Sequence, residues 1–236
     1  MPTEGELNQG LIQAAVNGDE FRVSELIRDG ADPNFQSKTD GKTALFHACS
    51  ENNVECVQAL LAAKADPELE DTLGFRPLHW AAQKGDGLGV VRALLEGGAD
   101  VDALNRKKQT ALNMAAFKGL KDVVRTLVDI GKANLEAADG SKKGKRALHV
   151  ATEKGDKELL KMLLAWNVDT SAKCSEGGHP HAQCLPSVAS AVSVKMYQRL
   201  PGNTAVDLAK STKYKHKGTK KSILELLVRC HKPSDC

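Results

Sequence analysis

Two thiols and two imidazoles lie close together in the segment CSEGGHPHAQC, as Cys174, His179, His181 and Cys184. Both side-chain types are ligands that Zn²⁺ prefers. However, the C-x4-H-x-H-x2-C spacing matches no usual zinc module, and Pro180 restricts how both imidazoles can point inward. A disulfide between the two cysteines and an ordinary loop are the other interpretations. The sequence alone leaves these alternatives open, and it predicts no metal site.

The rest of the chain offers little else that resembles an active site. The glycines of GDGLGV at 85–90 are turn-formers, because no strand precedes them as a phosphate-binding loop requires. No nucleophile, base and carboxylate recur at a useful spacing. We therefore expect a protein that is not an enzyme, with no cofactor and no small-molecule substrate.

The elements that position these residues are clearest in the stretch 76–105, RPLHWAAQKGDGLGVVRALLEGGADVDALN. Its apolar spacing predicts two short helices, 77–85 and 89–96. Pro77 is tolerated in a first helical turn. Gly97 or Gly98 can supply the left-handed residue that ends the second helix. Such a thin pair leaves one flank uncovered, so it needs a neighbour of the same kind.

The neighbours are present. Thr43, Arg76, Thr110 and Arg146 mark equivalent points of four copies, 33, 34 and 36 residues apart, and weaker copies lie at 11–34 and 204–228. The pattern resembles the ankyrin repeat family, whose consensus is matched most closely by RPLHWAAQKG and VRALLEGGADVD. A chain built of such repeats is stabilised by contacts between neighbouring repeats.

The resemblance implies an all-α ankyrin repeat solenoid of about six helix-turn-helix repeats joined by hairpin loops. We expect a single domain over 1–236. Its repeats are expected at about 6–40, 41–74, 75–108, 109–143, 144–201 and 202–236, with a long insert at about 174–200 between repeats five and six.

Several positions have a framework role in this family. His79 and His149 occupy the histidine position, where the ring binds backbone groups and ties the helix to the hairpins. Phe46 and Asn113 replace that histidine in the second and fourth repeats. Asn52 stands where the family has glycine, and asparagine tolerates the left-handed conformation that this turn needs.

The first repeat reads as a cap. Its opening helix lacks the family signature and carries Glu6, Asn8, Gln9 and Gln13, which suit a terminal surface facing water. The resemblance also marks Asn34, at the end of GADPN, as a hairpin asparagine of the kind that is hydroxylated in some ankyrin proteins.

The charge of the chain is unevenly divided. Residues 1–100 carry 8 Lys and Arg against 17 Asp and Glu, and residues 101–236 carry 25 against 13. Such a field orients charged partners. The polar start of the chain and the lack of a long apolar run give no sign of a targeting or spanning segment, so we expect a monomer in the cytoplasm, with the nucleus as an alternative.

The resemblance places partner contacts on the concave face, at the hairpin tips and at the exposed turn of each first helix. Phe75 and Phe117 are large apolar residues at such positions, and lysine and arginine dominate from the fourth repeat onward. The expected partner-binding residues are Leu73, Phe75, Lys84, Arg106, Lys107, Gln109, Phe117, Lys118, Lys142, Lys143, Lys145 and Lys154.

These features favour a scaffold or adaptor that binds another protein through an apolar anchor and an acidic segment. The alternative is a module in the basic C-terminal half that binds a polyanion, either nucleic acid or anionic lipid. Nucleic acid is less favoured, because aromatic residues that stack on bases are scarce in that half.

Overall fold

The computed structural model describes residues 2–140, 144–166 and 168. It divides into two compact units, 1–134 and 135–236. The predicted insert at 174–200, the sixth repeat and the candidate zinc ligands lie outside the described residues. Among the helices of the described part, none has the length and apolar character needed to cross a membrane.

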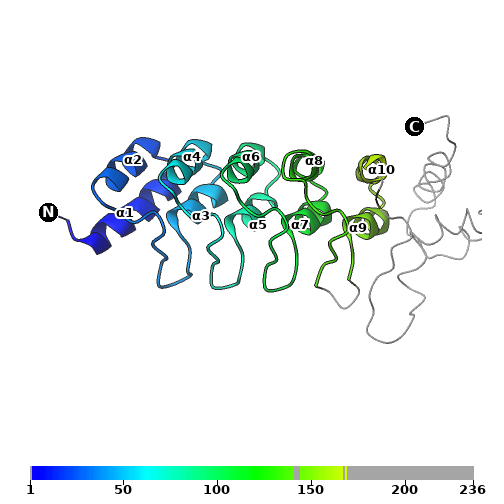
Figure 1. The fold of residues 1–236 in the computed structure, drawn as a ribbon, viewed down its shortest axis with the longest axis horizontal. Helices are drawn as coiled ribbons and strands as arrows, with labels where there is room; N and C mark the ends of the chain where they lie inside the picture. The colour runs from blue at the N-terminus through cyan, green and yellow to red at the C-terminus, as the bar shows by residue number, and fades with distance from the viewer. Residues whose placement is uncertain (1, 141–143, 167, 169–236) are drawn as a thin grey trace, which may run out of the picture. The chain divides into compact units, whose positions relative to one another are not determined.

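The first unit consists of four helix pairs (Figure 1). The pairs are α1 (Glu4–Asn17) with α2 (Glu20–Arg28), α3 (Ala44–Ser50) with α4 (Val54–Ala62), α5 (Pro77–Ala81) with α6 (Leu88–Glu96), and α7 (Ala111–Lys118) with α8 (Lys121–Asp129). Helices α1, α3, α5 and α7 pack in chain order as one row, and α2, α4, α6 and α8 pack as a second row. This arrangement confirms the expected stack of helix pairs within this unit.

The first helix of a pair begins where a side chain accepts a backbone hydrogen bond. The Thr43 hydroxyl accepts from the N–H of Phe46 at 3.2 Å, and the Thr110 hydroxyl accepts from the N–H of Asn113 at the same distance. In α5 the Nδ1 atom of His79 accepts from the N–H of Arg76 at 3.1 Å. These contacts satisfy amide groups that have no partner inside the helix.

Left-handed residues follow α3 and α6, as the sequence predicts. Asn52 has φ +63° in the turn after α3, and Gly98 has φ +89° after α6. Helix α5 ends at Ala81, which is earlier than the predicted end of the helix at 77–85. In the turn that follows, Gly87 lies close to the end of α5. A Cβ placed on Gly87 would lie 3.1 Å from the carbonyl oxygen of Ala81.

The core of the first unit follows the apolar pattern. Leu45, Leu60, Leu94, Leu112 and Leu127 have no exposed surface. Small alanines on the first helices let the two rows approach closely, and each layer of leucines is covered by the next repeat. At about 25 cal/mol per Å² of buried apolar surface, this shared burial is the main stabilising term of the stack.

Successive hairpins are also linked by hydrogen bonds. In each hairpin an oxygen of one side chain accepts from a backbone N–H in the next repeat. The three links are Asn34 to Asp66 at 2.7 Å, Glu68 to Asp100 at 2.9 Å, and Asp102 to Asn134 at 2.8 Å. A hydrogen bond to an amide oxygen contributes about 0.5–1.5 kcal/mol and one to a charged oxygen up to about 3 kcal/mol, so this ladder fixes the hairpins to one another.

The described part of the second unit is one further helix pair, α9 (Ala147–Lys154) and α10 (Lys157–Ala165). Leu159 and Leu163 are buried on α10, and His149 is buried on α9, where its Nδ1 accepts from the N–H of Arg146 at 3.2 Å. The guanidinium of Arg146 also pairs with Glu136 at 2.6 Å. This pair has the same local construction as the repeats of the first unit.

Candidate functional site

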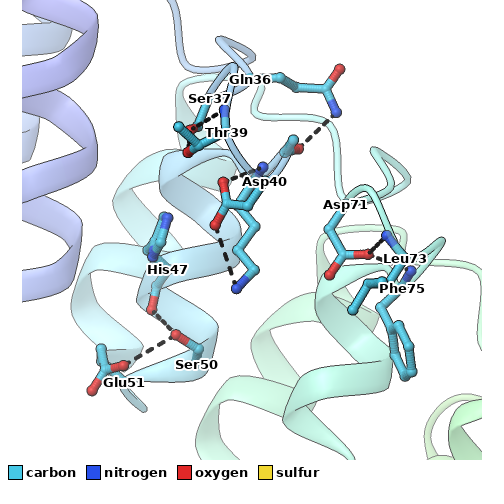
Figure 2. A network of polar contacts seen from close by, with 12 residues as sticks. Gln36, Ser37, Thr39, Asp40, His47, Ser50, Glu51, Asp71, Leu73 and Phe75 are labelled. Carbon is cyan, nitrogen blue, oxygen red and sulfur yellow. Dashed lines mark hydrogen bonds and ion pairs between the residues drawn. The ribbon is translucent and has the colours of Figure 1, made fainter.

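The hairpin tip before α5 displays an apolar side chain. The carboxylate of Asp71 accepts hydrogen bonds from the N–H groups of Leu73 at 2.9 Å and Phe75 at 2.8 Å, which closes the tip (Figure 2). Leu73 is 63% exposed as a result. An exposed leucine on a tip that its own aspartate holds in place is preorganised for contact with a partner.

Phe75 differs from the expectation of an exposed ring. It is half-buried, with ring centroids 6.1 Å from His79 and 6.0 Å from Trp80. Contact with two aromatic neighbours in the first turn of α5 removes part of the ring from water, which stabilises this conformation. The ring of Phe75 therefore lies within the surface and does not protrude from it as an anchor would.

Trp80 is a residue that the sequence analysis missed. It lies within the helix motif, whereas the expected contact positions lie before the motif and after the paired alanines. The half-buried indole contacts the ring of Phe46 at 6.0 Å, and the Nζ atom of Lys42 lies 5.3 Å from its centroid. Its Nε1 atom is buried and makes no hydrogen bond in the described part of the chain. The large indole side chain within RPLHWAAQKG was the available signal.

The next hairpin packs its tip against the first. The guanidinium of Arg106 donates to the carbonyl oxygen of Thr72 at 2.5 Å. The side-chain oxygen of Asn105 accepts from the N–H groups of Lys107 and Gln109 at 2.9 and 3.0 Å, as Asp71 does one repeat earlier. Arg106 thus serves the hairpin contact, and the side chain of Lys107 is left exposed to solvent.

Phe117 and Lys118 are the last two residues of α7, and both are exposed. Phe117 is 61% exposed, and the helix ends at Gly119, whose φ is +77°. The six preceding residues of α7 are all buried. Large exposed aromatic side chains are common where partners bind.

The remaining predicted cations differ in what they contact. The Nζ atom of Lys84 donates to the carbonyl oxygen of Ser50. In the second unit Lys145 pairs with Glu153 at 2.5 Å, so its charge is partly compensated inside the chain. Lys154 is exposed at the end of α9. Lys142 and Lys143 lie outside the described residues.

A histidine lies between two carboxylates on the second repeat. Burial lowers the pKa of His47, and the negative charges of Asp40 and Glu51 partly oppose that shift. Ser50 donates to the backbone carbonyl of His47 at 3.0 Å and to Glu51 at 3.2 Å (Figure 2). His47 is therefore neutral near pH 7.

No cluster of three or more His, Cys, Asp or Glu residues suited to a metal ion occurs among the described residues.

The comparisons with known proteins agree with this architecture. A sequence model described as ankyrin repeats, three copies, matches residues 11–105 and 86–174. The ankyrin repeat domain-containing protein 63 of Homo sapiens is 36% identical over 108 residues, which cover 44% of this chain and 28% of that protein. The neurogenic locus notch homolog protein 1 of Mus musculus is 33% identical over 143 residues, covering 60% of this chain and 6% of that protein.

One relative corrects the prediction about catalysis. The palmitoyltransferase AKR1 of Lachancea kluyveri is 32% identical over 171 residues, which cover 71% of this chain and 23% of that protein. The prediction of a protein that is not an enzyme was wrong, because a protein that shares this region of sequence is named as an enzyme. The chain spans less than a third of the length of each of these relatives.

Proposed function

The chain belongs to the ankyrin repeat family, and from this premise we propose that it binds another protein through the hairpin tips and first helices of repeats two to four. We name this region the recognition surface and define it by Leu73, Phe75, Trp80, Lys107, Gln109, Phe117 and Lys118. The exposed aromatic ring of Phe117, beside cationic residues, is the observation that carries the proposal.

The chemistry of the recognition surface favours a partner segment with an apolar anchor and acidic residues. Leu73 and Phe117 are more than half exposed and offer apolar area on the hairpin tip before α5 and at the end of α7. Lys107 and Lys118 make no ion pair among the described residues. Apolar burial supplies most of the affinity of such a contact, and complementary charge adds rate and specificity.

We further propose that the protein acts as a scaffold or adaptor, as a monomer, in the cytoplasm or nucleus. Cys49 and Cys56 are both buried free thiols, which fits a reducing compartment. Burial also raises the pKa of both thiols, so neither is activated as a nucleophile.

The proposal is tested by quantitative affinity capture with matched variants. Leu73→Ser with Phe117→Ser should reduce recovery of the bound protein about tenfold or more, since truncation of an anchor costs ~2 kcal/mol. The control is Phe21→Ser, because Phe21 lies on α2, in the second row of helices, and is 80% exposed. Equal recovery for all three chains would overturn the proposal.

The charged part of the proposal needs its own variant. Lys107→Glu with Lys118→Glu should weaken capture, and the difference from the unmodified chain should shrink as salt rises, because exposed charges are screened within about 8 Å at physiological ionic strength. Recovery that is unchanged at moderate salt would remove the acidic segment from the proposal. Recovery of nucleic acid in place of protein would support the polyanion alternative.

A further inference from the structure

The hairpin and first helix of the second repeat carry carboxylates that would extend the recognition surface. Glu51 is exposed at the end of α3, and Asp40 lies in the adjoining hairpin, with half-buried His47 between their charges (Figure 2). The structure shows no ion pair for Glu51 within its described part. A carboxylate is therefore available to a cation from outside the chain.

Lys42 and Lys84 contact residues at this end and are already engaged. The Nζ atom of Lys42 lies 3.5 Å from Asp40, 5.5 Å from the ring centroid of Phe46 and 5.3 Å from that of Trp80. Lys84 donates to the carbonyl oxygen of Ser50. Cation–π contacts and a carbonyl acceptor hold both ammonium groups in place, so they compensate Glu51 only weakly.

The hairpin tip before α7 and the end of α7 supply the opposite end. Lys107 and Lys108 are exposed on that tip, and Lys118 is exposed at the end of α7. None of the three makes an ion pair with another described residue. Between the two ends lie the Phe75 and Trp80 rings of the third repeat, with centroids 6.0 Å apart.

We propose that the partner segment is charge-bipolar. It carries a basic side chain that meets Glu51, an apolar residue over Phe75 and Trp80, and acidic side chains over Lys107, Lys108 and Lys118. This inference rests on the proposed function and adds the order of charges along the bound segment. A segment placed the other way round would bring like charges together at both ends, which selects one orientation.

The test uses a displayed library of random 12-residue peptides, selected against the full chain. We expect enriched peptides to contain an apolar residue with acidic residues on one side and a basic residue on the other. Glu51→Lys should remove the preference for the basic residue and keep that for the acidic residues. An exposed charge pair contributes about 0.2–1 kcal/mol, so bipolar peptides should bind this variant about 1.4-fold to fivefold more weakly.

Glu96→Lys is the matched control, because Glu96 is an exposed glutamate at the end of α6, in the second row of helices. It should leave the selected peptides unchanged. Peptides with apolar and acidic residues but no basic preference, alike for all three chains, would overturn the bipolar segment and leave the proposed function standing. Enrichment no greater than on an unrelated repeat protein would overturn both.

Discussion

His79 links two repeats through backbone groups on both sides of its ring. Its Nδ1 accepts from the N–H of Arg76, so its Nε2 carries the hydrogen that is shared with the carbonyl oxygens of Ala103 at 3.0 Å and Gln109 at 3.1 Å. The framework role that the family resemblance implies for this histidine is confirmed by these contacts. Asn113 makes the local contact of that role in the fourth repeat, since its side-chain oxygen accepts from the N–H of Thr110 at 3.1 Å.

His79→Asn should separate the local contact of His79 with Arg76 from its contacts with Ala103 and Gln109. The asparagine can still accept from the N–H of Arg76, but it is too short to reach Ala103 and Gln109. Carbonyl oxygens left without a donor should lower the free energy of unfolding by about 1–3 kcal/mol in urea titration. His47→Asn is the control and should change it by less than about 1 kcal/mol. Equal effects would contradict the linking role.

The same histidine predicts how stability depends on pH. Burial lowers the pKa of His79 below its ordinary value of 6.5, and the two carbonyl contacts only partly offset this. The neutral ring is therefore favoured in the folded chain, whereas the unfolded chain takes up a proton first as the pH falls below 6.5. The free energy of unfolding should fall from pH 6.5 downward until the pH passes the lowered pKa. A His79→Asn chain with the same slope would contradict this assignment.

At the residue scale, the sequence predicted framework positions better than surface ones. His79, Asn52 and the exposed Phe117 follow from local pattern, because each depends on a turn or a helix end. Asn8 was expected to face water, yet it is buried and accepts from the N–H of Asp32 at 2.7 Å. The half-burial of Phe75 depends on Trp80, which is a tertiary contact that a pattern within one repeat does not reveal.

At the scale of elements, the hairpins depend on glycine where neighbouring tips meet. Gly74 has φ +75°, and a Cβ placed there would lie 2.2 Å from the Cγ atom of Arg106. Gly98 has φ +89° with open space around it. The two glycines therefore separate the cost of a left-handed backbone from the cost of a close approach.

Gly98→Ala should lower the free energy of unfolding by about 1–2 kcal/mol, which is the cost of the left-handed conformation alone. Gly74→Ala should cost more, because the new methyl group displaces Arg106 from the carbonyl oxygen of Thr72. Thermal and urea unfolding of both variants measure the difference. If Gly74→Ala were no more destabilising than Gly98→Ala, the tip contact would contribute nothing to stability.

Helix positions were predictable at this scale, but their ends were less so. The apolar spacing of 89–96 matches α6 closely, whereas α5 ends at Ala81 because the glycine-containing turn 82–87 begins earlier than the pattern indicates. The helix end depends on how this turn packs against its own helix. That packing involves backbone groups, which the types of side chain indicate only weakly.

At the scale of the whole molecule, repetition made the fold predictable and function much less so. An array of helix pairs buries its leucines between neighbours whatever it binds, so the pattern that identifies the family is silent about the partner. The enzyme named among the relatives shows the same limit, because it shares this region of sequence. The assignment of one domain over 1–236 and of a sixth repeat stays a prediction.

The central claim is that a partner protein contacts Phe117 on the recognition surface. Photo-crosslinking tests this claim most directly. Benzoylphenylalanine is placed at position 117 or, as the control, at position 21 of α2, where Phe21 is also exposed. Irradiation in native extract, followed by mass spectrometry, identifies what is attached. We predict a discrete protein adduct at 117 that is absent at 21. Adducts of equal yield at both positions, or an adduct at 21 alone, would contradict the account.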